Sequence, residues 1–242
     1  MKLIKSLFLF ALTMFALSAF AQDAVKLELA KKYPEVKPER ITKTTYGNLF
    51  EVFAGGEIFY TDEKVTFLLL GTLVDTQTRT NISEARLQKL TAINFNDLPF
   101  DQAIKLVRGN GSRRMAIFAD PNCGYCKRFE QDVNTTDNIT AYIFTYPILA
   151  QDSIEKSKSI WCSTDRLKAW QDQMLRAKAP TAAGTCSTPV DTVLALGRKM
   201  NVTGTPTTFF EDGERISGAL PKERIEAKLV AATAAMVAGA AK

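Results

Sequence analysis

The sequence of 242 residues contains no histidine. Histidine titrates near neutral pH without any perturbation, and it is the commonest metal ligand in proteins. Its absence excludes Ser-His and Cys-His dyads, acid–base catalysis by histidine, and histidine metal sites. Any catalytic group in this chain therefore belongs to another side-chain type.

Long hydrophobic runs are missing after the N-terminus. The first run, Leu7–Phe20, follows the basic residues Lys2 and Lys5 and leads into the small-x-small sequence AFA. Roughly 14 residues are fewer than the ~20 that span a bilayer. A basic start, an apolar stretch and a small-x-small site are typical of a secretory signal. The sequence thus predicts a cleaved signal peptide over residues 1–21 rather than a membrane anchor.

Strong net charge is missing as well. Once Lys2 and Lys5 leave with the signal, the 31 basic residues fall to 29 against 26 acidic ones, a net charge of +3. The two signs are interspersed, so the sequence indicates no basic patch for nucleic acid. The mature length of about 221 residues suffices for one large domain or two modest ones.

Cysteine is scarce, and its four copies form two pairs. Cys123 and Cys126 lie in the stretch FADPNCGYCKRFE, while Cys162 and Cys186 have 23 residues between them. A CxxC pair can attach haem, bind zinc, form a short structural disulfide or exchange electrons. Haem attachment requires CxxCH, but Lys127 follows here, and zinc requires a second ligand pair of suitable spacing. An inert disulfide and a redox-active pair therefore stay open.

Residues 22–80 predict a small mixed domain. A helix is expected from Gln22 to Tyr33, before Pro34. Runs rich in Thr, Phe, Tyr, Val and Leu then predict an antiparallel meander of three or more short strands. Because ~60 residues with one short helix bury too little apolar surface to be stable alone, a partner surface is expected. The apolar strand Phe67–Leu70 is its expected place.

Residues 81–104 are expected to connect this domain to a second one over residues 105–242. Asn81 and Glu84 form a capping box that starts a linker helix. The second domain has the expected order strand, strand, helix, strand, helices, strand, strand, helix. Its first two strands are predicted to form a hairpin around Gly109-Asn110-Gly111.

The position of the CxxC pair favours redox chemistry. The continuous apolar run Met115–Ala119 suits a central strand, and it delivers Cys123 to the start of a helix. Free backbone N–H groups and the helix dipole favour a thiolate there, which is the reactive form of cysteine. Cys126, about one turn later and less exposed, can attack a mixed disulfide formed at the first sulfur. The pattern predicts Cys123 as the nucleophile and Cys126 as the resolving thiol.

Two further features accompany this pair. Thr205-Pro206, between a helix end and the strand TTFF, suits a cis peptide in a tight connection, although a trans proline in an ordinary loop also fits. Cys162 lies in a helical segment and Cys186 in a polar loop. They are expected to form a second, structural disulfide that stabilises the fold by ~3 kcal/mol in the chain-entropy model.

The stretches FADPNCGYC and VTGTPTTFF resemble a thioredoxin-fold redox domain. With the preceding module, the linker helix and the dipeptide Gly124-Tyr125, the mature chain resembles the DsbC/DsbG family of disulfide isomerases. The resemblance is strongest over residues 115–130 and 201–220. It implies an α+β N-terminal dimerisation domain, a linker helix, and an α/β thioredoxin-like fold with a helical insertion.

The same resemblance implies the site and its surroundings. The implied site has no metal and no cofactor, and consists of the active cysteines Cys123 and Cys126, their neighbours Gly124, Tyr125, Thr205 and Pro206, and the structural disulfide Cys162–Cys186. The segment Asp120-Pro121-Asn122 departs from the family pattern. A carboxylate of Asp120 close to Cys123 would disfavour the thiolate.

The resemblance also implies partners and a compartment. It implies a periplasmic homodimer with a shared apolar cleft, which acts on unfolded or misoxidised exported proteins and is re-reduced by a membrane-bound thiol reductant similar to DsbD. The implied reaction is disulfide isomerisation or reduction, with chaperone-like client binding. DsbG-like reduction of single sulfenylated cysteines and client binding without redox chemistry stay open as alternatives.

Overall fold

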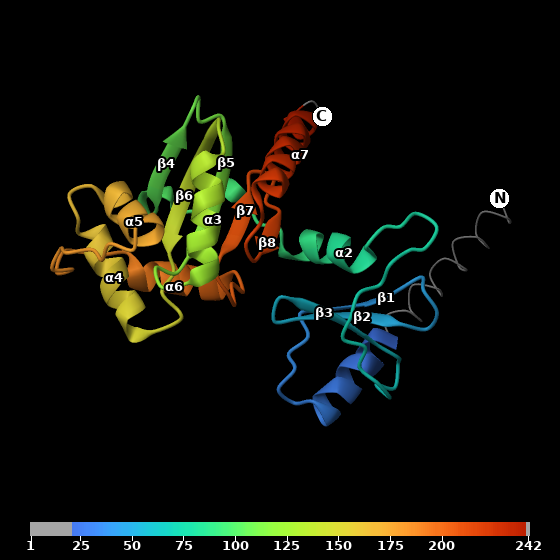
Figure 1. Cartoon of the computed structure of the whole chain (residues 1–242). Helices are drawn as coiled ribbons and strands as arrows, with labels where there is room; N and C mark the ends of the chain where they lie inside the picture. Colours follow the sequence, from blue (N-terminus) through green and yellow to red (C-terminus); the bar gives the residue numbers. More distant parts are fainter. Residues whose placement is uncertain (1–20, 241–242) are drawn as a thin grey trace, which may run out of the picture. The chain divides into compact units, whose positions relative to one another are not determined.

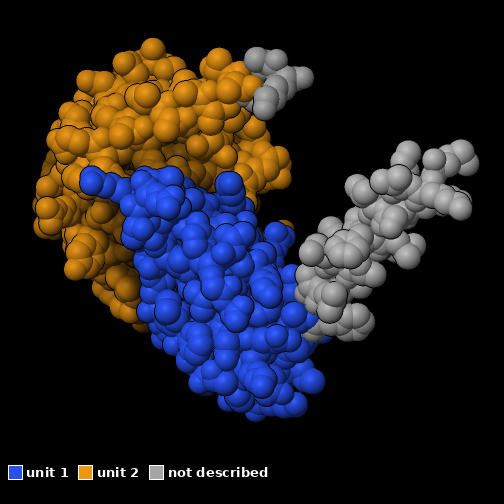
Figure 2. Space-filling view, turned by 90° about the vertical axis from the view of Figure 1, so that its right-hand side faces the viewer, with its two compact units in different colours: residues 1–90 blue, residues 91–242 orange. Residues whose placement is uncertain are grey.

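The computed structural model describes residues 21–240, so the expected signal peptide lies outside the described residues except for Ala21. The chain divides into two compact units, residues 1–90 and 91–242, which Figure 2 distinguishes by colour. In the described part of the chain, every helix is too short or too polar to cross a membrane.

The first unit consists of a helix over residues 21–32 and an antiparallel sheet. The sheet has the order β1-β2-β3, with β1 at Arg40–Lys43, β2 at Phe50–Ala54 and β3 at Glu57–Thr61. Val25 and Leu29, four residues apart on one helix face, bury their side chains with those of β2 and β3. The predicted helix and antiparallel meander are therefore confirmed.

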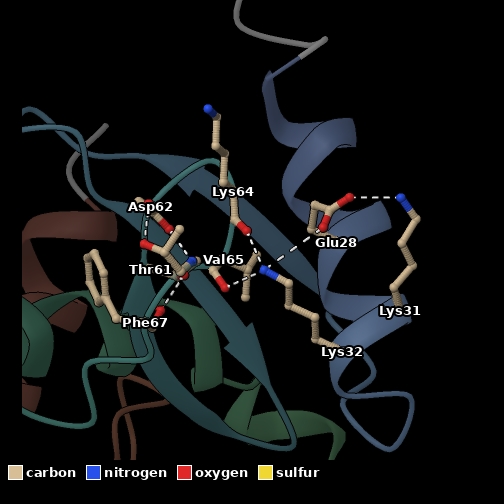
Figure 3. A network of polar contacts seen from close by, with 9 residues as sticks. Glu28, Lys31, Lys32, Thr61, Asp62, Lys64, Val65 and Phe67 are labelled. Carbon is tan, nitrogen blue, oxygen red and sulfur yellow. Dashed lines mark hydrogen bonds and ion pairs between the residues drawn. The ribbon is translucent and has the colours of Figure 1, made fainter.

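A polar network fixes the turn that follows β3 (Figure 3). The Nζ of Lys32 donates to the carbonyl oxygens of Lys64 at 2.8 Å and Val65 at 2.9 Å. The carboxylate of Asp62 accepts 2.6 Å hydrogen bonds from the backbone N–H and the hydroxyl of Thr66. These bonds hold Val65 at φ 50°, a left-handed conformation that β-branched residues rarely adopt.

The prediction of a strand over Phe67–Leu70 is wrong. Within this segment only Leu69 pairs with another strand, through a single antiparallel bridge to Tyr60 of β3. The Thr61 hydroxyl donates to the Phe67 carbonyl at 2.6 Å, so a side chain occupies a position that ladder pairing would need. The segment nevertheless exposes apolar side chains, and Leu70 is 80% exposed.

Helix α2 (Ile82–Thr91) starts as predicted, with the Asn81 side chain accepting from the Glu84 backbone N–H at 2.9 Å. Its first part is tied to β2 by Arg86, which donates to the buried Glu51 carboxylate through both Nε and Nη2. The division between the two units falls inside this helix.

The second unit is built on a five-stranded mixed sheet of order β4-β6-β5-β7-β8. Its strands are β4 (Ile104–Arg108), β5 (Arg113–Ala119), β6 (Ile139–Thr145), β7 (Thr207–Phe210) and β8 (Arg215–Ser217). The central strands β5 and β6 are parallel, and the other neighbouring pairs are antiparallel. Its core strands are nearly wholly buried, as strands covered on both faces are.

The predicted β4–β5 hairpin is wrong, because β6 lies between these two strands. Consecutive parallel strands joined by a helix tend to lie side by side, so β5 and β6 pair and β4 takes the edge. The burial of β4 alternates, which suits an edge strand. The turn crosses the end of β6 through Gly109 at φ 56°, where an added Cβ would lie 2.4 Å from the Asn138 side chain.

Helices cover both faces of this sheet (Figure 1). Side chains of α3 (Gly124–Thr135), α4 (Gln151–Trp161), α5 (Arg166–Leu175) and α7 (Lys222–Ala240) share one core with Met115 and Ile117 of β5. Helix α6 (Val190–Lys199) and the short turns η1 (Phe95–Asp97) and η2 (Phe100–Gln102) pack on the opposite face. The expected helical segment after β6 is thus two helices, α4 and α5.

A disulfide joins Cys162 and Cys186, with an S–S distance of 2.05 Å and a Cα–Cα distance of 5.7 Å. Cys162 is the C-terminal cap of α4, and Cys186 lies in the loop before α6. The link closes a loop with a sequence separation of 24 residues around the whole of α5.

Candidate active site

Cys123 occupies the N-cap position of α3. Strand β5 ends at Ala119, three residues form a turn, and the helix begins at Gly124. Cys123 has extended backbone angles, and its Sγ accepts a hydrogen bond from the Cys126 backbone N–H at 3.2 Å. The sulfur therefore acts as the side-chain acceptor of an N-cap. The free backbone N–H groups at a helix N-terminus favour a negative charge at this position.

The loop before β7 brings Thr205 to the same sulfur. The Thr205–Pro206 peptide bond is cis, and the Cys123 thiol donates to the Thr205 carbonyl oxygen at 3.3 Å. The Pro206 carbonyl oxygen accepts from Gly218 N–H at 2.8 Å, which attaches this loop to the end of β8. The fold thus assembles residues separated by 82 positions in the sequence.

The two thiols are free and buried. The side chain of Cys126 is 2% exposed. Burial raises its pKa far above the usual cysteine range, and the Cys123 side chain raises it further. Cys126 is therefore a neutral thiol at neutral pH, and it requires deprotonation before it can attack a disulfide.

The surface beside Cys123 offers apolar contacts. Tyr125 is 71% exposed, and its ring lines a pocket of about 400 Å³ together with Arg128, Thr205 and Leu220. An added Cβ at Gly124 would meet nothing within 4 Å, so the space before the helix is open.

Asp120 organises the approach to the helix. It is fully buried, and its carboxylate accepts from the backbone N–H groups of Asn122, Ile148 and Leu149 at 2.8–3.0 Å and from the Ser153 hydroxyl at 2.8 Å. The carboxylate is thus used to join β5, the loop after β6 and the first turn of α4. The sequence signal for this role is an Asp that can accept from the backbone N–H two residues later, which is typical of turns.

Glu130 is a second buried carboxyl group, which sequence analysis did not single out. It lies one turn after Cys126, its side chain is 3% exposed, and its Oε1 has no hydrogen-bond partner. The signal available in the sequence was its place on the apolar face of α3, which Cys126, Phe129 and Val133 define. Across residues 21–240, His, Cys, Asp and Glu side chains form no group of three that could hold a metal.

Comparison with known proteins identifies the family. A thioredoxin-like domain profile matches residues 100–233, and the disulfide bond isomerase protein N-terminal domain matches residues 16–84. A probable thiol:disulfide interchange protein DsbC from Bordetella pertussis is 48% identical over 207 residues, which are 86% of this chain and 74% of the relative. The chain belongs to the DsbC family. It is therefore a thiol:disulfide oxidoreductase of the DsbC type.

More distant relatives extend the likeness along the chain. The DsbC protein of Escherichia coli K12 is 24% identical over 87% of this chain and 89% of the relative. The crystal structure of a disulfide interchange protein from Neisseria gonorrhoeae is 39% identical, with a TM-score of 0.53, and covers 55% of this chain and 96% of that one. DsbC membership confirms the family resemblance and the predicted combination of a small N-terminal domain with a thioredoxin-like domain.

Proposed function

We propose that this DsbC-family chain is a periplasmic disulfide isomerase that uses Cys123 and Cys126 to rearrange wrong disulfides in exported proteins. The position of the Cys123 Sγ carries the proposal. This atom accepts from the Cys126 N–H at the start of α3 and lies 3.3 Å from the Thr205 carbonyl oxygen. It is therefore placed at the N-terminus of a helix and beside backbone with which a client segment can pair.

The reaction begins when the Cys123 thiolate attacks a client disulfide. A mixed disulfide forms between Cys123 and the client, and the second client sulfur leaves as a thiolate. That thiolate attacks another client disulfide and, through further exchange, releases Cys123, which completes isomerisation. Where it does not, Cys126 attacks Cys123 and releases a reduced client. The oxidised pair then needs a membrane-bound thiol reductant similar to DsbD.

Client binding is assigned to the surface around the thiols. The backbone of Thr205 and Pro206 borders Cys123, so an extended client segment can pair with it in the manner of an added strand. The exposed ring of Tyr125 and the adjoining pocket, with Leu220, offer apolar contact for the residues beside the attacked cysteine. Gly124 leaves room for this approach.

Residues 22–80 are assigned as a homodimerisation domain, residues 81–104 as the connector, and residues 105–242 as the catalytic domain. The exposed side chains of Phe67, Leu69 and Leu70 support a contact surface on the first unit.

Export to the periplasm follows from the signal predicted over residues 1–21. The Cys162–Cys186 disulfide is assigned a structural role, because it joins the end of α4 to the loop before α6 and closes a loop around α5.

Refolding of scrambled ribonuclease tests the isomerase assignment. The wild-type protein is expected to restore ribonuclease activity in a buffer of low thiol content, and Cys123→Ala is expected to lose this activity entirely. Cys126→Ala is expected to accumulate mixed disulfides with the client. Gln131→Ala, on the exposed side of the same helix, is the matched control and keeps wild-type activity. Isomerisation by Cys123→Ala at the wild-type rate would refute the assignment.

A further inference from the structure

The buried thiol of Cys126 must lose its proton before it can attack a disulfide. As the proposed resolving thiol it must attack as a thiolate, yet it is 2% exposed and burial keeps it protonated. Transfer of its proton to bulk solvent is hindered by the same burial. Each resolution step therefore requires a proton acceptor inside the protein.

Glu130 is placed to meet this requirement. It follows Cys126 by four residues on α3, and residues four apart on a helix have Cβ atoms about 5–6 Å apart. A helical side chain leans toward the N-terminus and covers the preceding turn. The Glu130 side chain therefore leans toward the turn that carries Cys126, and both residues belong to the buried face of the helix.

One oxygen of the Glu130 carboxyl group, Oε1, has no hydrogen-bond partner, and neither has the Nε1 of Trp170 on α5. Burial raises the pKa of Glu130 to about 7, and the indole of Trp170 opposes the increase only in part. Buried polar groups without partners are costly, and groups with perturbed pKa values gather at functional sites. A carboxyl that titrates near neutrality can both take and release a proton.

Among the described residues, the ion pairs of the neighbouring helices do not include Glu130. Burial and Trp170 are the influences on the pKa of Glu130, and no ionised group contributes. On the two helices that pack against α3, Asp172 of α5 pairs with Lys168, Arg176 and Lys178, while Glu226 and Lys228 of α7 pair with Arg113 and Glu214. Arg166 of α5 stacks on Trp161.

We propose that Glu130 is the proton acceptor for Cys126 in the resolution step. The inference rests on the proposed roles of Cys123 and Cys126. The Cys126 S–H transfers its proton to the Glu130 carboxylate, and the Cys126 sulfur attacks Cys123 Sγ. The Cys123–Cys126 disulfide forms, the Cys123–client disulfide breaks, and the client sulfur leaves as a thiolate that takes a proton from solvent. The pair loses two electrons and the client cysteines gain them.

This role gives Glu130 control over the outcome of the reaction. Fast deprotonation of Cys126 ends a mixed disulfide early and releases a reduced client. Slow deprotonation leaves the client attached for longer, so its own thiols have more time to rearrange. Replacement of Glu130 is therefore expected to shift the products from reduction toward isomerisation.

Rapid mixing of the reduced full-length mature protein with one equivalent of 4,4′-dithiodipyridine separates the two steps. The first release of thiopyridone reports the reaction of Cys123, and the second reports attack by Cys126. The aromatic thiol leaves without needing a proton, so the second phase isolates the deprotonation of Cys126. In the wild type its rate is expected to rise with pH and to level off above about pH 7, following the ionisation of Glu130.

Variants of Glu130 supply the decisive comparison. Glu130→Gln is expected to slow the second phase at least about tenfold at pH 7.5 and to abolish the break near pH 7. Glu130→Asp restores a carboxyl and is expected to restore the break with an intermediate rate. Asp172→Asn removes a different carboxyl, held by Lys168 and Arg176, and should leave the profile unchanged. A wild-type rate and break in Glu130→Gln would overturn the inference.

The same experiment distinguishes this inference from the proposed function. If the second phase is absent from the wild type, or persists in Cys126→Ser, the resolving role of Cys126 is wrong. If the phase depends on Cys126 but ignores Glu130, only the inference is wrong. Should Glu130→Gln fail to fold, carboxyl ¹³C NMR of the wild type decides. A Glu130 midpoint near 7 is expected, and a midpoint near 4.5 would overturn the inference.

Discussion

Two buried carboxyl groups near the thiol pair differ in the hydrogen bonds that their oxygens accept. Asp120 accepts three backbone N–H groups and a hydroxyl, whereas Glu130 keeps an oxygen without a partner. A carboxylate with fixed donors joins the segments of backbone that donate to it. A carboxyl without them titrates near neutrality and can exchange a proton. The first residue therefore holds the architecture of the site, and the second is available for its chemistry.

Removal of the Asp120 carboxylate is expected to destabilise the second unit. Asp120→Ala leaves several backbone donors without an acceptor, so the free energy of unfolding should fall by about 3 kcal/mol. Trp161 and Trp170 are the chain's two tryptophans, and both belong to this unit. Their fluorescence during urea denaturation therefore reports its unfolding.

Asp152 provides the matched control for this measurement. Its side chain is 54% exposed, and it accepts from Lys156 and Asn122 at 2.8 Å. Exposed pairs of this kind contribute little to stability, so Asp152→Ala should cost under about 1 kcal/mol. Equal losses in the two variants would contradict the role assigned to Asp120.

At the scale of elements, the junction of β5 with α3 positions the two cysteines of the CxxC pair. The buried strand β5 directs the chain to the end of the sheet, and the helix begins at the cysteine that follows. Strand β7 pairs with the other side of β5, so the loop that precedes β7 reaches the same end. Residues near positions 123 and 205 therefore meet because two strands pair, not because any local pattern connects them.

The disulfide between α4 and the loop before α6 is expected to serve stability rather than exchange. It closes a loop with a separation of 24 residues, so the double replacement Cys162→Ser and Cys186→Ser should lower the free energy of unfolding by about 3 kcal/mol. The rate at which Cys123 reacts with dithiodipyridine should stay unchanged at 25 °C. Loss of that reaction in a folded double variant would contradict a structural role. Ser187→Ala, in the same exposed loop, is the control.

At the scale of the whole molecule, the first unit exposes apolar side chains beside its sheet. The segment that contains Phe67, Leu69 and Leu70 follows the turn held by Lys32 and Asp62, and it makes one bridge to β3. Its backbone is therefore positioned while its side chains stay exposed. A small unit with few buried residues gains stability when such a surface is covered, which supports the proposed homodimer.

A charge in this segment is expected to separate the protomers. Leu70 is 80% exposed, so Leu70→Asp should leave the unit folded while it places a carboxylate in the proposed interface, where burial of an unpaired charge is costly. Sedimentation should report a shift from dimer to monomer. Leu27→Asp, at a 58% exposed position of the helix in the same unit, is the matched control and should stay dimeric. A dimeric Leu70→Asp would place the interface elsewhere.

Much of this molecule follows from local sequence. The capping pair Asn81 and Glu84, the apolar run of β5 and the CxxC at a helix start depend on neighbours in the chain, because helix caps, strand burial and the N-terminal anion site are local effects. They sufficed to predict the main elements and the thiol pair, whereas the thioredoxin-like fold was predicted from the family resemblance.

Other features were decided by tertiary structure. Strand β6 separates β4 from β5, since pairing is chosen by which apolar faces can share a core and not by proximity in the chain. The carboxyl groups of Asp120 and Glu130 differ because backbone N–H groups donate to the first, whereas burial and the indole of Trp170 set the pKa of the second. A sequence lists ionisable groups, but burial and partners set their protonation, and these exist only in the folded chain.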